Sequence, residues 1–274
     1  MAVKMMDLLT GELAALRYQP TAKRVRTFLA GEPVADTTAA RLVWEPRRVV
    51  PIYAVPISSL TAQLLPAGAE SGDDVDTGYR MPDISERAVL DPSVPFAVHT
   101  CPGTVYDVIA GEDTAGRAAF RPDDSDLNDY VILDFAAFEW REEDEPIVSH
   151  PHDPFSRIDV RRSSRHVRIE HEGRLLAESK RPMLLFETLL PVRYYLPRED
   201  VVVRLEPSDK VSFCAYKGRA SYFSVVDGPR DIGWTYHDPL HDAEQVRDRI
   251  CFFDERLDVT VDGERVTRSV TPWS

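Results

Sequence analysis

The segment VRIEHEGRLLAES, residues 167–179, carries the pattern that decides the fold. Two short strand-like runs, Val167–Ile169 and Leu175–Ala177, flank the dipeptide Glu172-Gly173. Apolar runs of this length are typical of strands, and a glycine between them accommodates the positive φ of a tight turn. The segment therefore predicts a β-hairpin.

An earlier segment repeats this pattern, because residues 25–37 read VRTFLAGEPVADT. At one constant offset, Val25, Arg26, Gly31, Ala35, Leu42, Glu45 and Tyr53 are identical to Val167, Arg168, Gly173, Ala177, Leu184, Glu187 and Tyr195. After a change of offset, Cys101, Gly103 and Tyr106 match Cys214, Gly218 and Tyr222. Self-similarity of this kind predicts two copies of one domain in tandem, with Glu45 equivalent to Glu187 and Cys101 to Cys214.

The repeat sets the expected domain boundaries. We place the first, divergent copy at residues 22–147 and the second at 161–274, with a charged, proline-containing linker at 148–160. Residues 1–21 are expected to form an amphipathic helix, because apolar residues recur there at helical spacing. The first copy has an insertion at residues 61–93, rich in Gly, Asp, Ser and Pro, which we expect to be a surface loop or lid.

Short strand signals continue through the second copy. Met183–Glu187, Val192–Leu196, Val201–Leu205, Val211–Cys214 and Ser221–Val225 follow one another at short spacings. Leu257–Val261 alternates and runs through Asp262-Gly263, the strongest hairpin signal in the chain. One helix is expected from Asp242 to about Arg249, because Asp242-Ala-Glu-Gln resembles a capping box. Many short strands and little helix predict a mainly β fold of small antiparallel domains.

Composition narrows the classes of function. The chain has 274 residues, 43% of them hydrophobic, and a net charge of −13. Such a surface repels phosphate backbones, so we expect no nucleic-acid partner. No stretch approaches the roughly 20 apolar residues that span a bilayer, and the start lacks the basic, uninterrupted apolar pattern of a secretory signal. We therefore expect a cytoplasmic protein without a membrane partner.

Cysteine and histidine spacing gives no sign of a metal or cofactor. The three cysteines form no C-x-x-C pair, so neither a disulfide framework nor a zinc site is expected. The histidines of His237-Asp-Pro-Leu-His241 and His150-Pro-His152 lie in proline-containing loops, which are typical of solvent-facing polar segments. We expect no bound metal and no cofactor.

Four motifs of the second copy occur in a characteristic order. They are Gly173-x-x-x-Ala177-x-Ser179, then Glu187-x6-Tyr194-Tyr195-x-Pro197-x-x-Asp200-Val201, then Cys214-Ala-Tyr-Lys217-Gly218-x-Ala220-Ser221-Tyr222, then Trp234-x-Tyr236-x-x-Pro239. This series resembles the family catalogued as domain of unknown function 427, and the first copy resembles it more faintly. The resemblance implies a β-tent-like fold, in which two small antiparallel sheets lean on each other. It implies no activity, and zinc held by paired cysteines, found in other proteins of that shape, does not carry over.

The candidate catalytic residues are Cys214, Lys217 and Glu187. A lysine near a thiol favours the thiolate, which is the nucleophile. A carboxylate at the end of an apolar strand needs a partner or a ligand. The structural alternatives are a buried thiol and an ion pair of Glu187 with Arg193 or Lys217.

The candidate ligand-binding residues are Tyr195, Tyr222, Trp234 and Tyr236. Trp234 and Tyr236 are two residues apart and share one strand face, as a core wall or as a stacking surface for a planar or cationic ligand.

These residues support three hypotheses of function. The first is a pocket of the second copy that binds a small polar or planar organic molecule. The second is an enzyme that uses the same pocket, with Cys214 as nucleophile or Glu187 as acid/base and Lys217 stabilising an anion. The third is a purely structural or interaction module. Lys217 and the Trp-x-Tyr motif have no sequence counterpart in the first copy, which favours a site in the second. The oligomeric state stays open.

Overall fold

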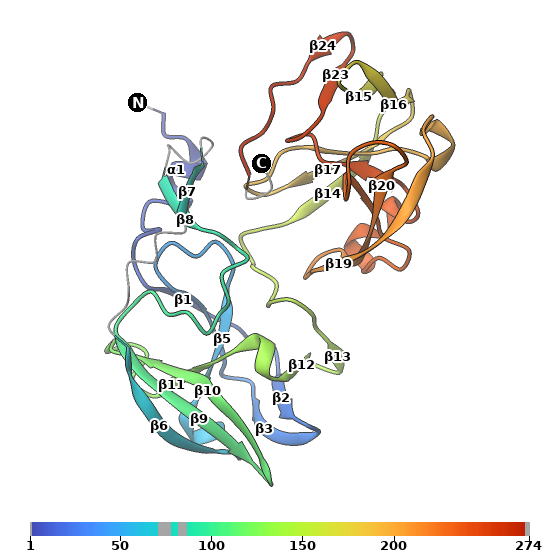
Figure 1. Ribbon diagram of the computed structural model, residues 1–274. Helices are drawn as coiled ribbons and strands as arrows, with labels where there is room; N and C mark the ends of the chain where they lie inside the picture. Colours follow the sequence, from blue (N-terminus) through green and yellow to red (C-terminus); the bar gives the residue numbers. More distant parts are fainter. Residues whose placement is uncertain (1, 71–77, 82–86, 272–274) are drawn as a thin grey trace. The chain divides into compact units, whose positions relative to one another are not determined.

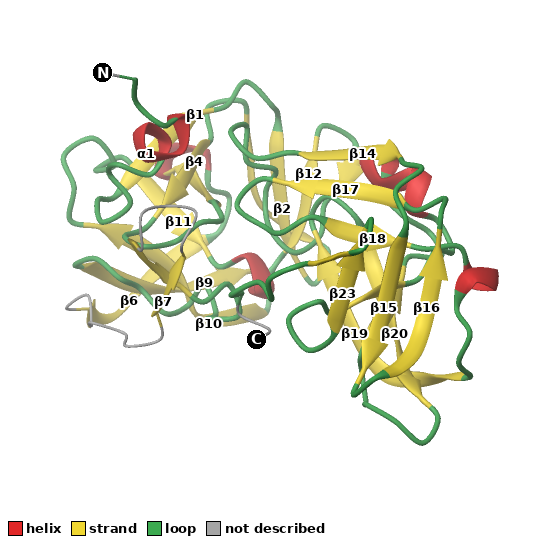
Figure 2. Ribbon diagram, turned by 90° about the horizontal axis from the view of Figure 1, so that it is seen from above, coloured by secondary structure: helices red, strands yellow, loops and turns green. Residues whose placement is uncertain are grey.

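The computed structural model describes residues 2–70, 78–81 and 87–271. The chain divides into two compact units, residues 1–153 (unit 1) and 154–274 (unit 2). Both are mainly β, with small antiparallel sheets and a few short helical turns, as Figures 1 and 2 show. The predicted fold class is confirmed. No helix in the described part of the chain is long and apolar enough to cross a membrane.

Unit 1 contains two sheets and a separate hairpin. Its elements are α1 (Met5–Leu9), β1 (Arg17–Pro20), β2 (Val25–Leu29), β3 (Glu32–Thr37), β4 (Arg41–Trp44), β5 (Ile52–Pro56), η1 (Ile57–Ser59), β6 (Gln63–Glu70), β7 (Gly78–Met81), β8 (Arg87–Leu90), β9 (Gly103–Ala110), β10 (Asp113–Pro122), β11 (Tyr130–Leu133), η3 (Phe135–Ala137), β12 (Glu139–Glu142) and β13 (Glu145–Pro146). The larger sheet has the order β1-β4-β5-β11-β10-β9-β6 and the smaller one β13-β12-β2-β3, while β7 pairs with β8.

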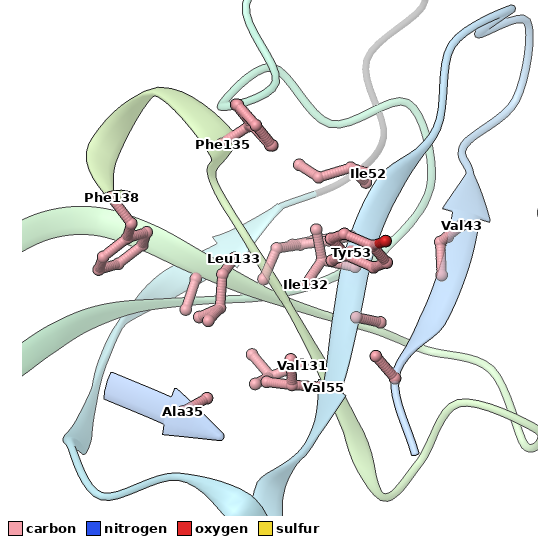
Figure 3. Close-up of a cluster of buried hydrophobic side chains, with 14 of the residues drawn as sticks. Ala35, Val43, Ile52, Tyr53, Val55, Val131, Ile132, Leu133, Phe135 and Phe138 are labelled. Carbon is pink, nitrogen blue, oxygen red and sulfur yellow. The ribbon is translucent and has the colours of Figure 1, made fainter. Parts of the chain in front are cut away.

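The core of unit 1 lies against its larger sheet. Side chains of the neighbouring strands β5 and β11 gather there with those of β4, as Figure 3 shows. Tyr53 is fully buried, and its hydroxyl hydrogen-bonds to Glu142 Oε1 at 2.8 Å. Phe135 stacks on Trp140 with 5.3 Å between ring centroids. The β-branched and aromatic residues of these strands therefore hold the two sheets together.

Unit 2 contains three sheets. Its elements are β14 (Ile158–Arg162), β15 (Val167–His171), β16 (Arg174–Ser179), β17 (Met183–Glu187), β18 (Arg193–Tyr195), η4 (Arg198–Asp200), β19 (Leu205–Cys214), β20 (Gly218–Val225), β21 (Gly233–Thr235), η5 (His241–Val246), β22 (Cys251–Phe252), β23 (Asp258–Val261) and β24 (Glu264–Arg265). The sheets are β14-β17-β18, β19-β20-β21-β22 and β16-β15-β23-β24. A bridge between Leu196 and Ile250, with backbone hydrogen bonds of 2.8 and 2.9 Å, links the first two.

The two units share one strand order. Across that bridge, unit 2 follows the series β14-β17-β18-β22-β21-β20-β19, which corresponds position by position to the larger sheet of unit 1. The pairing registers also agree. Val25 pairs with Thr37 and Glu142, and Val167 pairs with Ser179 and Val261. Isolated bridges recur as well, Ala35 with Leu60 and Ala177 with Val201.

The predicted hairpins of unit 2 form at the expected turns. Glu172 and Gly173 have φ values of 50° and 78°, and Asp262 and Gly263 have φ values of 54° and 87°. Two consecutive residues with positive φ make the turn whose twist matches that of the paired strands, which explains the glycine in each. The strand predicted at Met183–Glu187 has those bounds in the structure.

Three expectations outside the hairpins differ from the structure. Within residues 1–21, the helix covers only Met5–Leu9 and buries no residue, and Arg17–Pro20 is a strand, because this segment pairs along β4. The segment expected as a loop at 61–93 contains β6, an edge strand that pairs with β9, and the hairpin β7–β8; residues 71–77 and 82–86 lie outside the described residues. The helix expected from Asp242 is the 3-10 turn η5, which has no side-chain cap.

Candidate functional site

Lys217 and Glu187 form a nearly buried ion pair in unit 2. Glu187 is the last residue of β17, and Lys217 lies in the turn between β19 and β20, before Gly218. Gly218 has φ +85°, and a Cβ there would lie 3.4 Å from Leu240 Cγ, so the turn needs a glycine. Lys217 Nζ lies 2.5 Å from Glu187 Oε2. The structure thus selects Lys217 over Arg193 as the partner of Glu187.

The thiol of Cys214 lies beside this pair. Cys214 ends β19, pairs with Gly218 and is half-buried, whereas Cys101 and Cys251 are buried. Burial lowers the pKa of the Lys217 ammonium, but the Glu187 carboxylate and the Cys214 thiol, both within reach of its hydrogen bonds, outweigh burial and raise the pKa. Lys217 therefore keeps its charge at neutral pH and can stabilise an anion but cannot act as a base.

The four candidate aromatic residues pack on one another. Trp234 Nε1 donates a hydrogen bond to Tyr195 Oη at 3.2 Å, and the two rings meet edge to face. Tyr236 lies 6.5 Å from Tyr195 and Tyr222 lies 6.4 Å from Trp234, between ring centroids. All four side chains are buried. The four rings therefore form part of the core. The sequence had also allowed them to line an open cavity, but in the structure they pack against one another.

Tyr236 connects the aromatic cluster to the ion pair. Burial raises the pKa of the Tyr236 hydroxyl well above its usual value, and Tyr195, Cys214 and Glu187 add to the rise. Burial likewise keeps the Tyr195 hydroxyl protonated. The structure therefore brings all seven candidate residues into one connected cluster, contributed by β17 to β21 and the turns next to them.

Two cavities described on unit 2 lie away from this cluster. One, of about 200 Å³, lies between the β15–β16 turn and the segment after β20, and its lining includes His171, Arg174 and Asp227. The other, of about 440 Å³, is open and follows Arg265–Arg268. Among the described residues, no three His, Cys, Asp or Glu side chains come together as a metal site.

Sequence reasoning missed a second buried ion cluster next to Trp234. The Arg193 guanidinium binds Asp254 and both Glu255 oxygens, the latter at 2.5 and 2.9 Å. Thr271 Oγ1 also donates to Glu255 Oε1 at 2.6 Å. The guanidinium carbon lies 5.6 Å from the Trp234 ring. The signal was present in the sequence, because two acidic residues directly follow the apolar run Ile250–Phe253.

Unit 1 places a related pair at the corresponding position. Glu45 directly follows β4, as Glu187 ends β17, and Glu45 is buried. Its Oε1 lies 2.9 Å from His99 Nδ1, and its Oε2 accepts the Thr100 N–H at 2.7 Å. His99 precedes β9 as Lys217 precedes β20. Glu45 and Glu187 thus each pair with a basic side chain.

The two cysteines expected to be equivalent occupy different elements. Cys214 is the last residue of β19, whereas Cys101 lies in the loop that leads into β9. Because β9 corresponds to β20, the predicted match of Cys101 to Cys214 is wrong. Burial, followed by the charge of Glu45, raises the pKa of the Cys101 thiol to about 12.

Comparison with known proteins identifies one related family. A family model described as Domain of unknown function (DUF427) matches residues 159–263, a stretch within unit 2 that contains all seven candidate residues. No curated protein matches the chain.

Proposed function

We propose that unit 2 binds a small polar organic molecule at the cluster of Cys214, Lys217 and Glu187, with Tyr236 behind it. The observation that carries the proposal is the nearly buried Lys217–Glu187 pair. Removing two charges from water is unfavourable, and an apolar pair of similar size supports a fold at least as well. A pair retained next to a thiol and a phenol hydroxyl therefore favours recognition of a ligand over a role in folding alone.

The chemistry of the pair defines the ligand. A molecule that carries both an acceptor and a donor can replace the internal bond, with its acceptor on the Lys217 ammonium and its donor on the Glu187 carboxylate. Binding opens the pair, so a small rearrangement of the Lys217 side chain accompanies it.

A second candidate function is an enzyme in which Cys214 is the nucleophile. The observation that favours it is the position of the half-buried Cys214, which pairs with Gly218 across the turn that carries Lys217. A neighbouring cation favours the thiolate, and Lys217 would then stabilise the anion formed on the substrate.

We also infer that the two units are copies of one domain and that the protein works in the cytoplasm. The shared strand order and pairing registers support the duplication. Three free cysteines support a reducing compartment. Glu45 with His99 then represents the first copy's version of Glu187 with Lys217.

A ligand screen on paired variants tests the binding proposal. Wild-type protein and the double variant Lys217→Ala/Glu187→Ala are melted with a panel of amino acids, hydroxy acids and nucleobases. Removing both charges together leaves no unpaired charge, so the variant stays folded. The matched control, Glu45→Ala/His99→Ala, removes the related pair of unit 1. A compound that stabilises the wild type and the control but not the Lys217/Glu187 variant supports the proposal. Equal shifts in all three proteins, or none in any, would overturn it.

A further inference from the structure

An exposed lysine of unit 2, Lys210, covers two aromatic rings, Tyr222 and Phe253, that are themselves buried. The Lys210 ammonium lies 4.7 Å from the centroid of the Tyr222 ring and 5.9 Å from that of Phe253. These two rings are stacked at 6.2 Å, and Trp234 lies 4.6 Å from Phe253. We call Tyr222, Trp234 and Phe253 the aromatic platform. Its negative ring faces attract a cation, and at present that cation is the protein's own lysine.

Lys210 comes from an irregular part of an edge strand. The pairing of β19 with β20 breaks register between Pro207 and Val211, which places Lys210 in the bulge. β19 has a neighbour on one side only. The Lys210 N–H donates to Ser208 Oγ at 3.1 Å, and the Ser208 hydroxyl donates to Asp231 at 2.5 Å. A bulge re-aims a side chain, and here it turns Lys210 onto the platform.

The lysine is held there weakly. Lys210 is exposed, and no carboxylate in the described part of the chain forms an ion pair with its ammonium. A cation–π contact at an exposed site is weak, and an ammonium on a flexible four-carbon chain is strongly hydrated. A tetraalkylated ammonium is less hydrated than a lysine head group, so it competes well for the same ring faces.

We propose that the aromatic platform is a binding site for an organic cation, and that Lys210 fills the site until the cation displaces it. This inference goes beyond the proposed function, because the platform of Tyr222, Trp234 and Phe253 is separate from the Lys217–Glu187 pair. The Arg193 cluster behind Trp234 is already paired with two carboxylates, so it does not oppose the cation.

Titration with tetramethylammonium chloride tests the proposal, with potassium chloride at equal ionic strength as the reference. The readout is the NMR signal of the Trp234 indole N–H, assigned with Trp234→Phe. In Lys210→Ala the internal competitor is gone, so binding should tighten about tenfold, because a tethered group competes at millimolar effective concentration. Lys210→Glu should tighten it further, and Lys210→Arg should behave as the wild type. Lys180→Ala, an exposed lysine of the same unit, is the control.

Three results would overturn the proposal. They are an unmoved indole signal in Lys210→Ala, an equal response to potassium, and equal affinities in the alanine and arginine variants. Any of them would leave Lys210 as a cover for apolar surface only. The variant Lys217→Ala/Glu187→Ala separates this inference from the proposed function. If the platform acts independently, that variant still binds tetramethylammonium even where the ligand screen finds nothing.

Discussion

Lys217 Nζ lies 2.5 Å from Glu187 Oε2, and the two side chains are only 9% and 13% exposed. Water reaches these two charges only slightly, so each is stabilised mainly by the other. Such a pair adds little to stability as a whole, yet each member becomes strongly destabilising when it is left alone.

This dependence predicts the outcome of a double-mutant cycle. Lys217→Met leaves the Glu187 carboxylate buried without a partner and should lower the free energy of unfolding by about 3 kcal/mol. Lys217→Met/Glu187→Leu removes both charges and should lower it by less than the single change. Urea unfolding followed by circular dichroism measures both. A single variant as stable as the wild type would contradict the prediction.

Alkylation should distinguish Cys214 from the other cysteines. Burial raises the pKa of the Cys101 thiol to about 12 and raises that of Cys251 as well, so both stay protonated and inaccessible. Cys214 is half-buried beside the Lys217 ammonium, and iodoacetamide should modify it first, as read by peptide mass spectrometry.

The same measurement tests the enzyme hypothesis. Lys217→Met/Glu187→Leu, which leaves no unpaired buried charge, should slow alkylation of Cys214 at pH 7.5, because the ammonium beside the sulfur is gone. Lys180→Met serves as the control. An unchanged rate would remove the main support for Cys214 as a nucleophile.

Tyr195→Phe should destabilise unit 2 although it removes a single oxygen. The Trp234 indole N–H then loses its acceptor inside the core, and an unsatisfied buried donor costs about 1–3 kcal/mol. Tyr194→Phe is the matched control, because neighbouring residues of a strand face opposite sides and Tyr194 is only half-buried. Equal melting temperatures for the two variants would contradict the assignment.

Arg193→Met should destabilise unit 2 less in acid than at neutral pH. Burial raises the pKa of the Glu255 carboxyl, and hydrogen bonds from Arg193 and Thr271 outweigh burial and lower it. In Asp254, burial and the charge of Glu255 prevail and the pKa is raised. Without Arg193, burial should raise the pKa values of both carboxyls, Asp254 and Glu255. A raised folded-state pKa adds stability below the unfolded value, and this stability is lost as pH rises through the folded value.

The deficit of Arg193→Met relative to the wild type should therefore be smaller at pH 5 than at pH 8, by urea unfolding at each pH. Arg181→Met removes an exposed arginine that binds Glu199 and Asp200, and its deficit should stay small at both pH values. A deficit of Arg193→Met that grows in acid would contradict this account.

Local signals in the sequence predicted the strands and turns well. Glu172-Gly173 and Asp262-Gly263 are turn signals with a direct backbone cause, and both hairpins form. The prediction of a helix over residues 1–21 was wrong, because helical spacing of apolar residues does not show whether another element is there for the helix to pack against. Met5 and Leu8 stay exposed in α1, and Arg17–Pro20, at the end of the same segment, pairs with β4. Tertiary pairing overrode local propensity.

The candidate site was predicted as a set of residues but not as a shape. Motif order gave Glu187, Lys217 and Trp234, which the structure brings into one cluster. Residue identity cannot reveal whether aromatic side chains line a cavity or fill it, because that depends on how closely β18 and β21 approach. The Glu45–His99 pair was equally hidden, since residue identity cannot show that these two side chains meet.

The pairing of the second strand of each unit with a strand near its end has a consequence for synthesis. On one side β15 pairs with its sequence neighbour β16, and on the other side it pairs with β23, which is distant in the sequence. In the same way, β2 pairs with β3 and with the distant β12. Such distant pairings close late and slow folding, and a chain leaving the ribosome folds its first unit before its second. A chain that stops before Asp258 therefore presents β15 with an open edge, on which the same strand of another truncated chain can assemble.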